Sequence, residues 1–216
     1  MKCLSHIVFI SSIVLCSCNQ NPKSETPIVE TGGIDSAAIA EDTAMQKSID
    51  NSYEFATTVT ISPTLVYDIR AFGGTASKGA FAIIKRGADN KPDTVEQGER
   101  QGKIVNAFAA DLNNDKLTEI YMVTQSVDSG SFEDVIAYQF DETGLAKQLV
   151  VPKVTSEEIA AGYMGRDSIY IENNFLIRQF PAYKKNDAPC CPSGGSEKVY
   201  YQFKKNIFVK QKQVKS

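Results

Sequence analysis

Short apolar stretches, most of them alternating with polar residues, recur along the chain from Tyr53 onward. In residues 53–61, Phe55, Val59 and Ile61 share one parity, which is typical of a strand with one buried face. Turn signals such as the DETG and ENN clusters separate the stretches. The remaining strand-like stretches are residues 64–72, 79–86, 103–112, 117–125, 134–140, 145–151, 167–172, 175–180, 198–203 and 207–212.

One stretch only, residues 155–162, has the pattern of a helix, with Thr155 or Ser156 as the capping residue and carboxylates in its first turn. Many short strands joined by hairpin-length turns favour antiparallel sheets. The pattern therefore predicts an all-β fold: an antiparallel β-sandwich, or a barrel-like form of it, with about ten short strands and one short helix. No internal repeat is evident.

The N-terminus has the layout of an export signal. Lys2 precedes a nine-residue apolar run at 7–15, which is too short to span a bilayer, where about 20 residues are needed. Ser17 directly before Cys18, with Leu15 three residues upstream, resembles the bacterial lipobox, in which the cysteine is lipidated. We expect residues 1–17 to be a lipoprotein signal peptide and Cys18 to anchor the exported protein in a membrane.

The segment after the anchor lacks the residues needed for a core. Residues 19–52 contain no aromatic side chain and are rich in Pro, Ser, Thr and acidic residues, so they bury too little apolar surface to offset their ordering entropy. We expect residues 18–52 to form a lipidated flexible tether and residues 53–216 to form one domain. The lipoprotein would face the periplasm or the cell surface at the outer membrane, and the sequence leaves both open.

Composition restricts the chemistry. The net charge is −3, and the only histidine, His6, would be removed with the signal peptide. Because histidine is the commonest general base and metal ligand near neutral pH, catalytic Ser-His-Asp and Cys-His sites and histidine-based zinc sites are excluded. No carboxylate pair stands out. We expect a binding protein rather than an enzyme, without a nucleic-acid partner; homo-oligomerisation stays open.

A loop at 111–119 has the spacing of calcium ligands. Asp111, Asn113, Asp115 and Glu119 occupy the first, third, fifth and ninth positions. However, the sixth position is a lysine where the turn favours glycine, and the twelfth is a methionine in place of a bidentate carboxylate. Because such residues also form turns without an ion, we favour a turn and no cofactor, and keep calcium as the alternative.

Two C-terminal features have structural interpretations. Adjacent Cys190 and Cys191 lie in a loop and form either a strained vicinal disulfide or two unpaired thiols; the sequence does not decide between them. From Lys198 onward the chain carries six lysines and no acid. They could face an anionic surface, but we favour protection of an exposed sheet edge against pairing with other chains.

Five motifs in a fixed order and spacing carry a family resemblance. They are ADLNNDKLTEIYM at 110–122, SGSF at 129–132, AGYMGRD at 161–167, FLIRQFPAYK at 175–184 and PSGG at 192–195. Together they resemble the periplasmic inhibitors of invertebrate-type lysozyme, strongly over about residues 100–205 and more faintly from 53 to 102. The resemblance implies a lysozyme partner and a role in protecting bacterial peptidoglycan.

The resemblance also implies a binding loop. In that family a Ser-Gly-x-Tyr loop enters the substrate cleft of the lysozyme, and here Ser129, Gly130 and Phe132 match the serine, the glycine and the tyrosine. Ser129 would donate a hydrogen bond to a cleft carboxylate, Gly130 would permit a tight turn and close approach, and Phe132 would fill a sugar subsite. Phe132 lacks the phenol hydroxyl, and Arg166 stands where the family has histidine.

Two alternatives remain on the sequence alone. The Phe132 ring could fold back onto its own sheet instead of meeting a partner. The whole protein could be a calcium-stabilised binding or adhesion lipoprotein of the cell surface, using the loop at 111–119.

Overall fold

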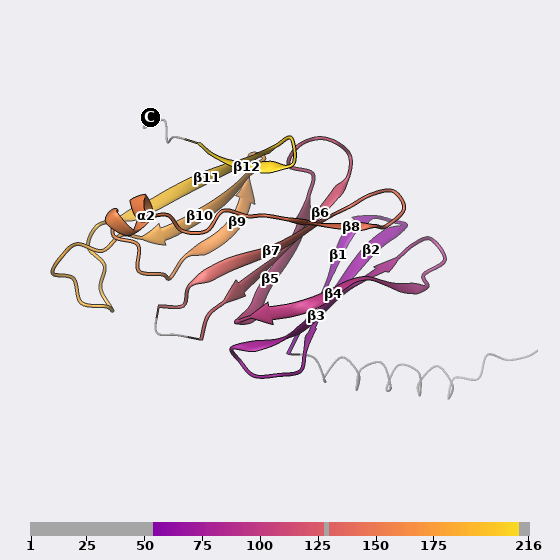
Figure 1. Cartoon of the computed structure of the whole chain (residues 1–216), viewed down its shortest axis with the longest axis horizontal. Coiled ribbons are helices and arrows are strands. Elements are labelled where there is room, and N and C mark those ends of the chain that lie inside the picture. Colours follow the sequence, from indigo (N-terminus) through magenta and orange to yellow (C-terminus); the bar gives the residue numbers. More distant parts are fainter. Residues whose placement is uncertain (1–53, 128–129, 212–216) are drawn as a thin grey trace, which may run out of the picture.

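The computed structural model describes residues 54–127 and 130–211 (Figure 1). The predicted signal peptide, Cys18, the tether and Ser129 lie outside the described residues. The described part forms twelve strands and one short helix, α2. The elements are β1 Phe55–Ser62, β2 Leu65–Phe72, β3 Lys78–Arg86, β4 Pro92–Gln101, β5 Lys103–Ala110, β6 Thr118–Gln125, β7 Glu133–Phe140, β8 Ala146–Leu149, α2 Ser156–Ala160, β9 Ser168–Glu172, β10 Phe175–Pro181, β11 Ser196–Lys204 and β12 Ile207–Gln211.

The strands form three four-stranded antiparallel sheets, each made of four consecutive strands. The sheet orders are β1-β2-β3-β4, β5-β6-β7-β8 and β12-β11-β10-β9, so every strand pairs with its neighbour in sequence. The middle sheet lies between the other two (Figure 1). The prediction of an all-β antiparallel fold is confirmed, and the described strands form open sheets rather than a closed barrel.

Strand β6 explains how the middle sheet holds the other two. Six of its eight residues are buried, because both of its faces are covered. Ile120 and Met122 belong to the core shared with the first sheet, while Tyr121 and Val123 belong to the core shared with the last sheet. Successive side chains of a strand point to opposite faces, so one strand contributes to two hydrophobic cores.

Strand β4 was missing from the sequence prediction, which placed a turn at its start. It is the edge strand of the first sheet and pairs only with β3. Val95 is its only large apolar residue, and most of its other side chains are polar. Because pairing with β3 holds the strand and one side is open to solvent, it carries no apolar alternation that a sequence pattern would reveal.

Helix α2 begins as the sequence indicates. Thr155 is the N-cap, its Oγ1 accepts a hydrogen bond from the Glu158 amide, and the Glu158 carboxylate accepts one from the Thr155 amide at 2.6 Å. This reciprocal arrangement is a capping box. Lys210 of β12 adds an ion pair to Glu158 at 3.1 Å, which ties the helix to the last sheet. In the described part of the chain, no helix has the length and apolar character to cross a membrane.

The last described strand, β12, is a sheet edge, as the sequence predicts for the lysine-rich end of the chain. Strand β12 is the outer strand of the last sheet, with Lys204 at the end of β11 and Lys205 in the turn before β12. Lysines beside an edge strand disfavour its pairing with another chain. One of them, Lys210, is used in the ion pair with Glu158.

Candidate binding site at the β6–β7 hairpin tip

The β6–β7 hairpin ends in a tip that Ser126 and Phe132 close. The Ser126 amide donates a hydrogen bond to the Phe132 carbonyl at 2.8 Å. In return the Phe132 amide donates to Ser126 Oγ at 3.1 Å. Below this pair the strands are in regular register, beginning with Gln125 opposite Glu133. The tip therefore extends directly from a rigid two-stranded ladder.

The Phe132 side chain is neither free nor buried. It is 42% exposed, and its ring lies over the backbone of Gly130, so that a Cβ on that glycine would come within 2.2 Å of the ring. The ring centroid is 5.8 Å from that of Tyr163. The alternative that the ring folds back on its own sheet is thus not what the structure shows, because the ring rests on the tip and on a neighbouring loop with a large part open to solvent.

Glycine at position 130 allows the Phe132 ring to pack closely against the backbone, and its own backbone conformation is not unusual. Among the described residues of the tip, Ser131 has a left-handed φ, at 45°. The lack of a side chain on Gly130 makes room for the Phe132 ring. The expected close approach of the Gly130 backbone to a partner stays a prediction, and the contact that the structure shows is with the Phe132 ring.

A second loop, residues 161–167, supports the tip from the side. The Arg166 amide donates a hydrogen bond to the Gly130 carbonyl at 2.8 Å. Gly165, with φ of +85°, lies so close that a Cβ there would be 2.1 Å from the Gly130 carbonyl oxygen. Only glycine combines that conformation with that contact. Two of the sequence motifs, SGSF and AGYMGRD, therefore meet in space.

A buried polar network joins the base of the tip to the last sheet. Asp167 is at its centre: it pairs with Arg178, accepts a hydrogen bond from the Glu133 amide at 2.9 Å and accepts another from the Tyr163 hydroxyl at 3.1 Å. Arg178 Nη1 also donates to the Glu133 carbonyl at 2.8 Å. Because Asp167 and Arg178 are both buried, each neutralises a charge that would otherwise be costly inside the protein.

The network changes the acidity of its members. Burial, followed by the charge of Asp167, raises the pKa of Glu133 to about 7, against a lowering contribution from the hydrogen bond of the Ile169 amide. Burial and then Asp167 also raise the pKa of the Tyr163 hydroxyl. Glu133 directly follows Phe132 in the chain, so a group that titrates near neutral pH lies at the base of the tip.

A cavity of about 940 Å³ opens beside the tip. Val127, Phe132, Ile159 and Met164 line it, and all four are apolar side chains exposed to solvent. Exposed apolar side chains gathered in one place are typical of a surface that a partner covers. The site therefore combines a protruding ring with a hollow next to it.

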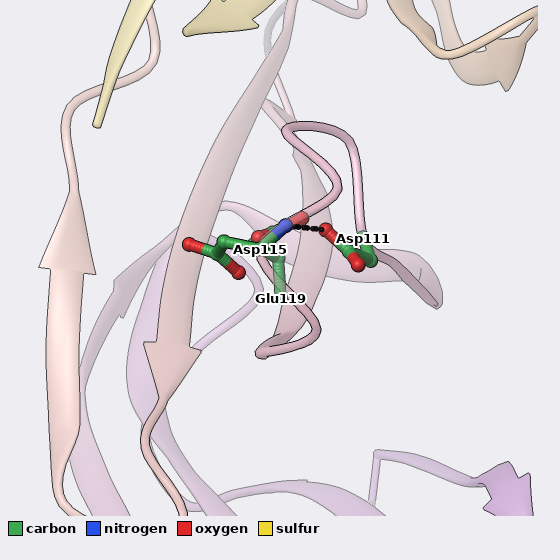
Figure 2. A group of neighbouring side chains, drawn as sticks. All are labelled: Asp111, Asp115 and Glu119. Atoms are coloured by element: carbon green, nitrogen blue, oxygen red, sulfur yellow. Dashed lines mark hydrogen bonds between the residues drawn. The ribbon is translucent and has the colours of Figure 1, made fainter. Parts of the chain in front are cut away.

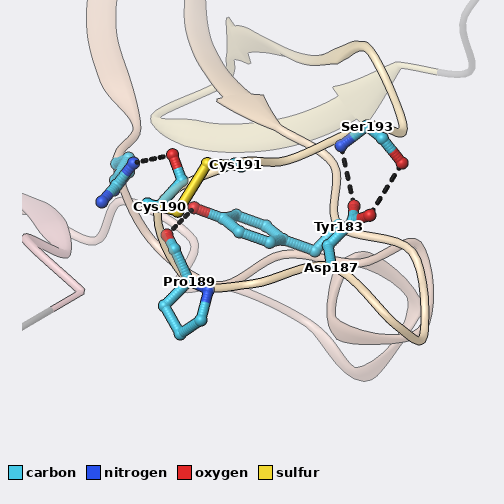
Figure 3. The surroundings of a disulfide bond; sticks show 7 residues. Tyr183, Asp187, Pro189, Cys190, Cys191 and Ser193 are labelled. Carbon is cyan, nitrogen blue, oxygen red and sulfur yellow. Dashed lines mark hydrogen bonds between the residues drawn. A yellow bond between two sulfur atoms is a disulfide. The ribbon is translucent and has the colours of Figure 1, made fainter.

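The disulfide loop also borders this cavity, through Pro189. Figure 3 shows the disulfide and the contacts around it. Cys190 and Cys191 form a vicinal disulfide, which settles the choice that the sequence left open. The Tyr183 hydroxyl donates to the Pro189 carbonyl at 3.0 Å, and both residues line the cavity. The Arg166 guanidinium donates to the Cys190 carbonyl at 3.3 Å, so this loop is connected to the one that supports the tip.

The acidic loop lies at the opposite end of β6, in the β5–β6 connection. The structure brings together three of its four predicted ligands: carboxylate oxygens of Asp111, Asp115 and Glu119 lie within 4.8 Å of one another (Figure 2). Asp111 accepts hydrogen bonds from the backbone amides of Asp115 and Lys116. The fourth, Asn113, donates its Nδ2 to Asp115 at 2.7 Å.

Hydrogen-bond donors already reach the oxygens that an ion would use. Gln139 Nε2 donates to Asp115 at 2.9 Å and to Glu119 at 3.0 Å, and the Leu112 amide donates to Glu119 at 2.8 Å. Burial raises the pKa of Glu119 to about 7 despite these bonds. The contacts support the interpretation as a turn, and calcium binding stays a prediction.

Sequence reasoning missed the support behind the tip. Tyr163, Asp167 and Arg178 were not predicted as site residues, although Arg178 lies inside an apolar strand, and an arginine in a buried strand signals a buried ion pair.

No family model matches this chain, and neither does any curated protein or solved structure. The resemblance to lysozyme inhibitors therefore stays a prediction.

Proposed function

We propose that this protein inhibits invertebrate-type lysozyme by inserting the tip of the β6–β7 hairpin into the substrate cleft. It would act as a binding protein and not as an enzyme. The proposal combines the motif resemblance with the geometry of the tip.

The observation that carries the proposal is the half-exposed Phe132 ring on a supported tip. The ring lies between the Gly130 backbone and Tyr163, and the tip is held by the Ser126 and Arg166 hydrogen bonds. A side chain ordered before binding loses little conformational entropy on binding. Covering the exposed part of an aromatic ring then contributes favourably through the apolar area removed from water.

The chemistry of a lysozyme cleft suits such a tip. Glycosidases place two carboxyl groups on either side of the bond they cleave. A ring in a sugar subsite excludes the substrate, and a Ser129 hydroxyl beside it would donate to one of these carboxylates. The tip contains no glycosidic bond, so the enzyme has nothing to cleave.

Export and lipid anchoring would place the inhibitor where the enzyme arrives. A Cys18 anchor with a tether at residues 18–52 would hold the domain near the peptidoglycan, at the periplasmic or outer face of the outer membrane. A tether of that composition would span roughly 30 Å on average. The inhibitor would protect the wall of the bacterium that makes it.

A clearing assay tests the proposal. Residues 19–216 are purified and added at micromolar concentration to invertebrate-type lysozymes that are clearing a cell-wall suspension. We expect slower clearing with at least one enzyme of a panel. Unchanged clearing with every enzyme of the panel would reject the proposal.

A calcium-stabilised binding or adhesion module is the second candidate. The observation in its favour is the convergence of the Asp111, Asp115 and Glu119 carboxylates. A ligand that binds only the folded state must raise its stability. Melting curves with calcium and with a chelator therefore discriminate, since a higher melting temperature with calcium supports this candidate and identical curves remove it.

A further inference from the structure

Arg166 differs from the other arginines of the chain. All five arginines lie in the described residues, and four have a carboxylate within ion-pair distance: Arg70 and Arg86 have Asp68, Arg100 has Glu54 and Arg178 has Asp167. Within the described part of the chain, Arg166 has no such carboxylate, and it is the only exposed arginine. Its guanidinium donates to a neutral acceptor, the Cys190 carbonyl.

The position of Arg166 is fixed relative to the tip. Its amide is hydrogen-bonded to Gly130, and its own φ of 57° is a left-handed conformation that non-glycine residues rarely adopt. The bond to Gly130 and the close packing of Gly165 hold this conformation. Arg166 lines the same cavity as Phe132, so a partner that fills this cavity meets both residues.

The other two cations that line the cavity are already engaged. Lys153 pairs with Asp134 at 3.0 Å, and Arg178 pairs with Asp167. Arg166 thus contributes a positive charge without a carboxylate partner in the described structure, and exposed apolar side chains line the same cavity. A partner that covers these side chains removes water from the guanidinium, and an opposite charge on the partner then contributes more than it would in open solvent.

We propose that Arg166 forms a second contact with the lysozyme, in which its guanidinium pairs with a carboxylate at the cleft while Phe132 occupies a sugar subsite. This inference rests on the proposed function and deepens it. The planar guanidinium suits a carboxylate, because its N–H groups donate to both oxygens in parallel. The hydrogen bond to the Cys190 carbonyl holds the guanidinium at the disulfide loop before binding.

Three variants of the chain used in the clearing assay, residues 19–216, test the inference: Arg166→Gln, Arg166→Lys and the control Lys204→Gln, which removes a charge from the exposed last residue of β11. None of the substitutions removes a backbone amide, so the hydrogen bond from the amide of residue 166 to the Gly130 carbonyl can still form. We expect Arg166→Gln to raise the inhibition constant roughly tenfold to a hundredfold, the range for a lost hydrogen bond to a charged group. Arg166→Lys should lie between the wild type and Arg166→Gln, and Lys204→Gln should stay within about twofold of wild type.

Salt gives a second measurement. Added salt should weaken the wild-type inhibitor more than it weakens Arg166→Gln, because the pair is electrostatic. Equal inhibition constants for Arg166→Gln and Lys204→Gln, with active wild type, would overturn this inference and leave the proposed function standing. Equal constants for Arg166→Gln and Arg166→Lys would also overturn it, since the charge would then have no effect. A wild-type protein that inhibits no lysozyme would instead remove the proposed function and this inference together.

Discussion

The rings of Phe132 and Tyr163 have centroids 5.8 Å apart, although Phe132 comes from the loop between β6 and β7 and Tyr163 from the loop between α2 and β9. Tyr163 in turn meets Phe180 edge to face at 4.9 Å, and Phe180 is buried in the core of the last sheet. A continuous row of three rings therefore runs from the exposed tip into the interior. Edge-to-face and tilted ring pairs of this kind stabilise beyond the area they bury.

Removing the Phe132 ring should weaken inhibition and leave the stability of the protein nearly unchanged. We expect Phe132→Ala to raise the inhibition constant by roughly thirtyfold or more, as for a buried aromatic anchor of an interface. The melting temperature should fall only slightly, because the ring is 42% exposed and contacts one other ring among the described residues. The matched control is Leu145→Ala, which removes a 72% exposed apolar side chain from the β7–β8 turn. Equal inhibition by the two variants would contradict the role of Phe132.

Two glycines with similar backbone conformations allow the effect of the contact between Gly165 and the Gly130 carbonyl to be measured. Gly165 and Gly195 have nearly the same φ, +85° and +87°, but a Cβ on Gly165 would meet the Gly130 carbonyl while one on Gly195 would meet nothing within 4 Å. Alanine at Gly195 should cost about 1–2 kcal/mol of unfolding free energy for the backbone conformation alone. Alanine at Gly165 should cost more and should also weaken inhibition. Urea unfolding measures the stability of the two variants, and the clearing assay measures their inhibition. Equal losses of stability and of inhibition in the two variants would show that the close approach of Gly165 to the Gly130 carbonyl is unimportant.

The buried pair Arg178–Asp167 should be important for stability. Arg178→Met leaves the Asp167 carboxylate buried without its cation, and we expect a loss of about 3–5 kcal/mol in the free energy of unfolding. Lys153→Met, which breaks the exposed pair with Asp134, should change it by no more than about 1 kcal/mol. Denaturant unfolding of both variants makes the comparison. A similar small loss in each would contradict the account of the network.

Stability should fall as the pH rises through neutrality. The pKa values of Glu119 and Glu133 are raised from an ordinary 4.5 to about 7 in the folded protein. The folded state therefore binds these protons more tightly than the unfolded state, and the stability that they contribute is fully present below about pH 4.5 and is lost as the pH rises through 7.

The double variant Glu119→Gln with Glu133→Gln checks the origin of this pH dependence, since neither amide ionises. Urea unfolding at a series of pH values from 5 to 8 should give a decreasing free energy for the wild type and a flatter line for the variant. A wild-type stability that increases over this range would show that burial does not control these two carboxyl groups.

The sequence predicted the strands that have apolar alternation and the helix that has a capping box, since both patterns are local. It did not predict β4, whose place in a sheet depends on β3 rather than on its own side chains. For the site, SGSF and AGYMGRD were identified separately. Their contact through Gly130 and Arg166 depends on how two sheets pack, and the row of rings behind Phe132 depends on the same packing. Both relationships are tertiary, and no spacing along the chain encodes them.

The mode of inhibition tests the central claim most directly. Steady-state rates of an invertebrate-type lysozyme on a soluble oligosaccharide are measured at several concentrations of the purified chain. If the Phe132 tip occupies the substrate cleft, the apparent KM rises linearly with inhibitor concentration and kcat is unchanged. A fall in kcat at constant KM would mean that the protein binds elsewhere on the enzyme, and would contradict the account.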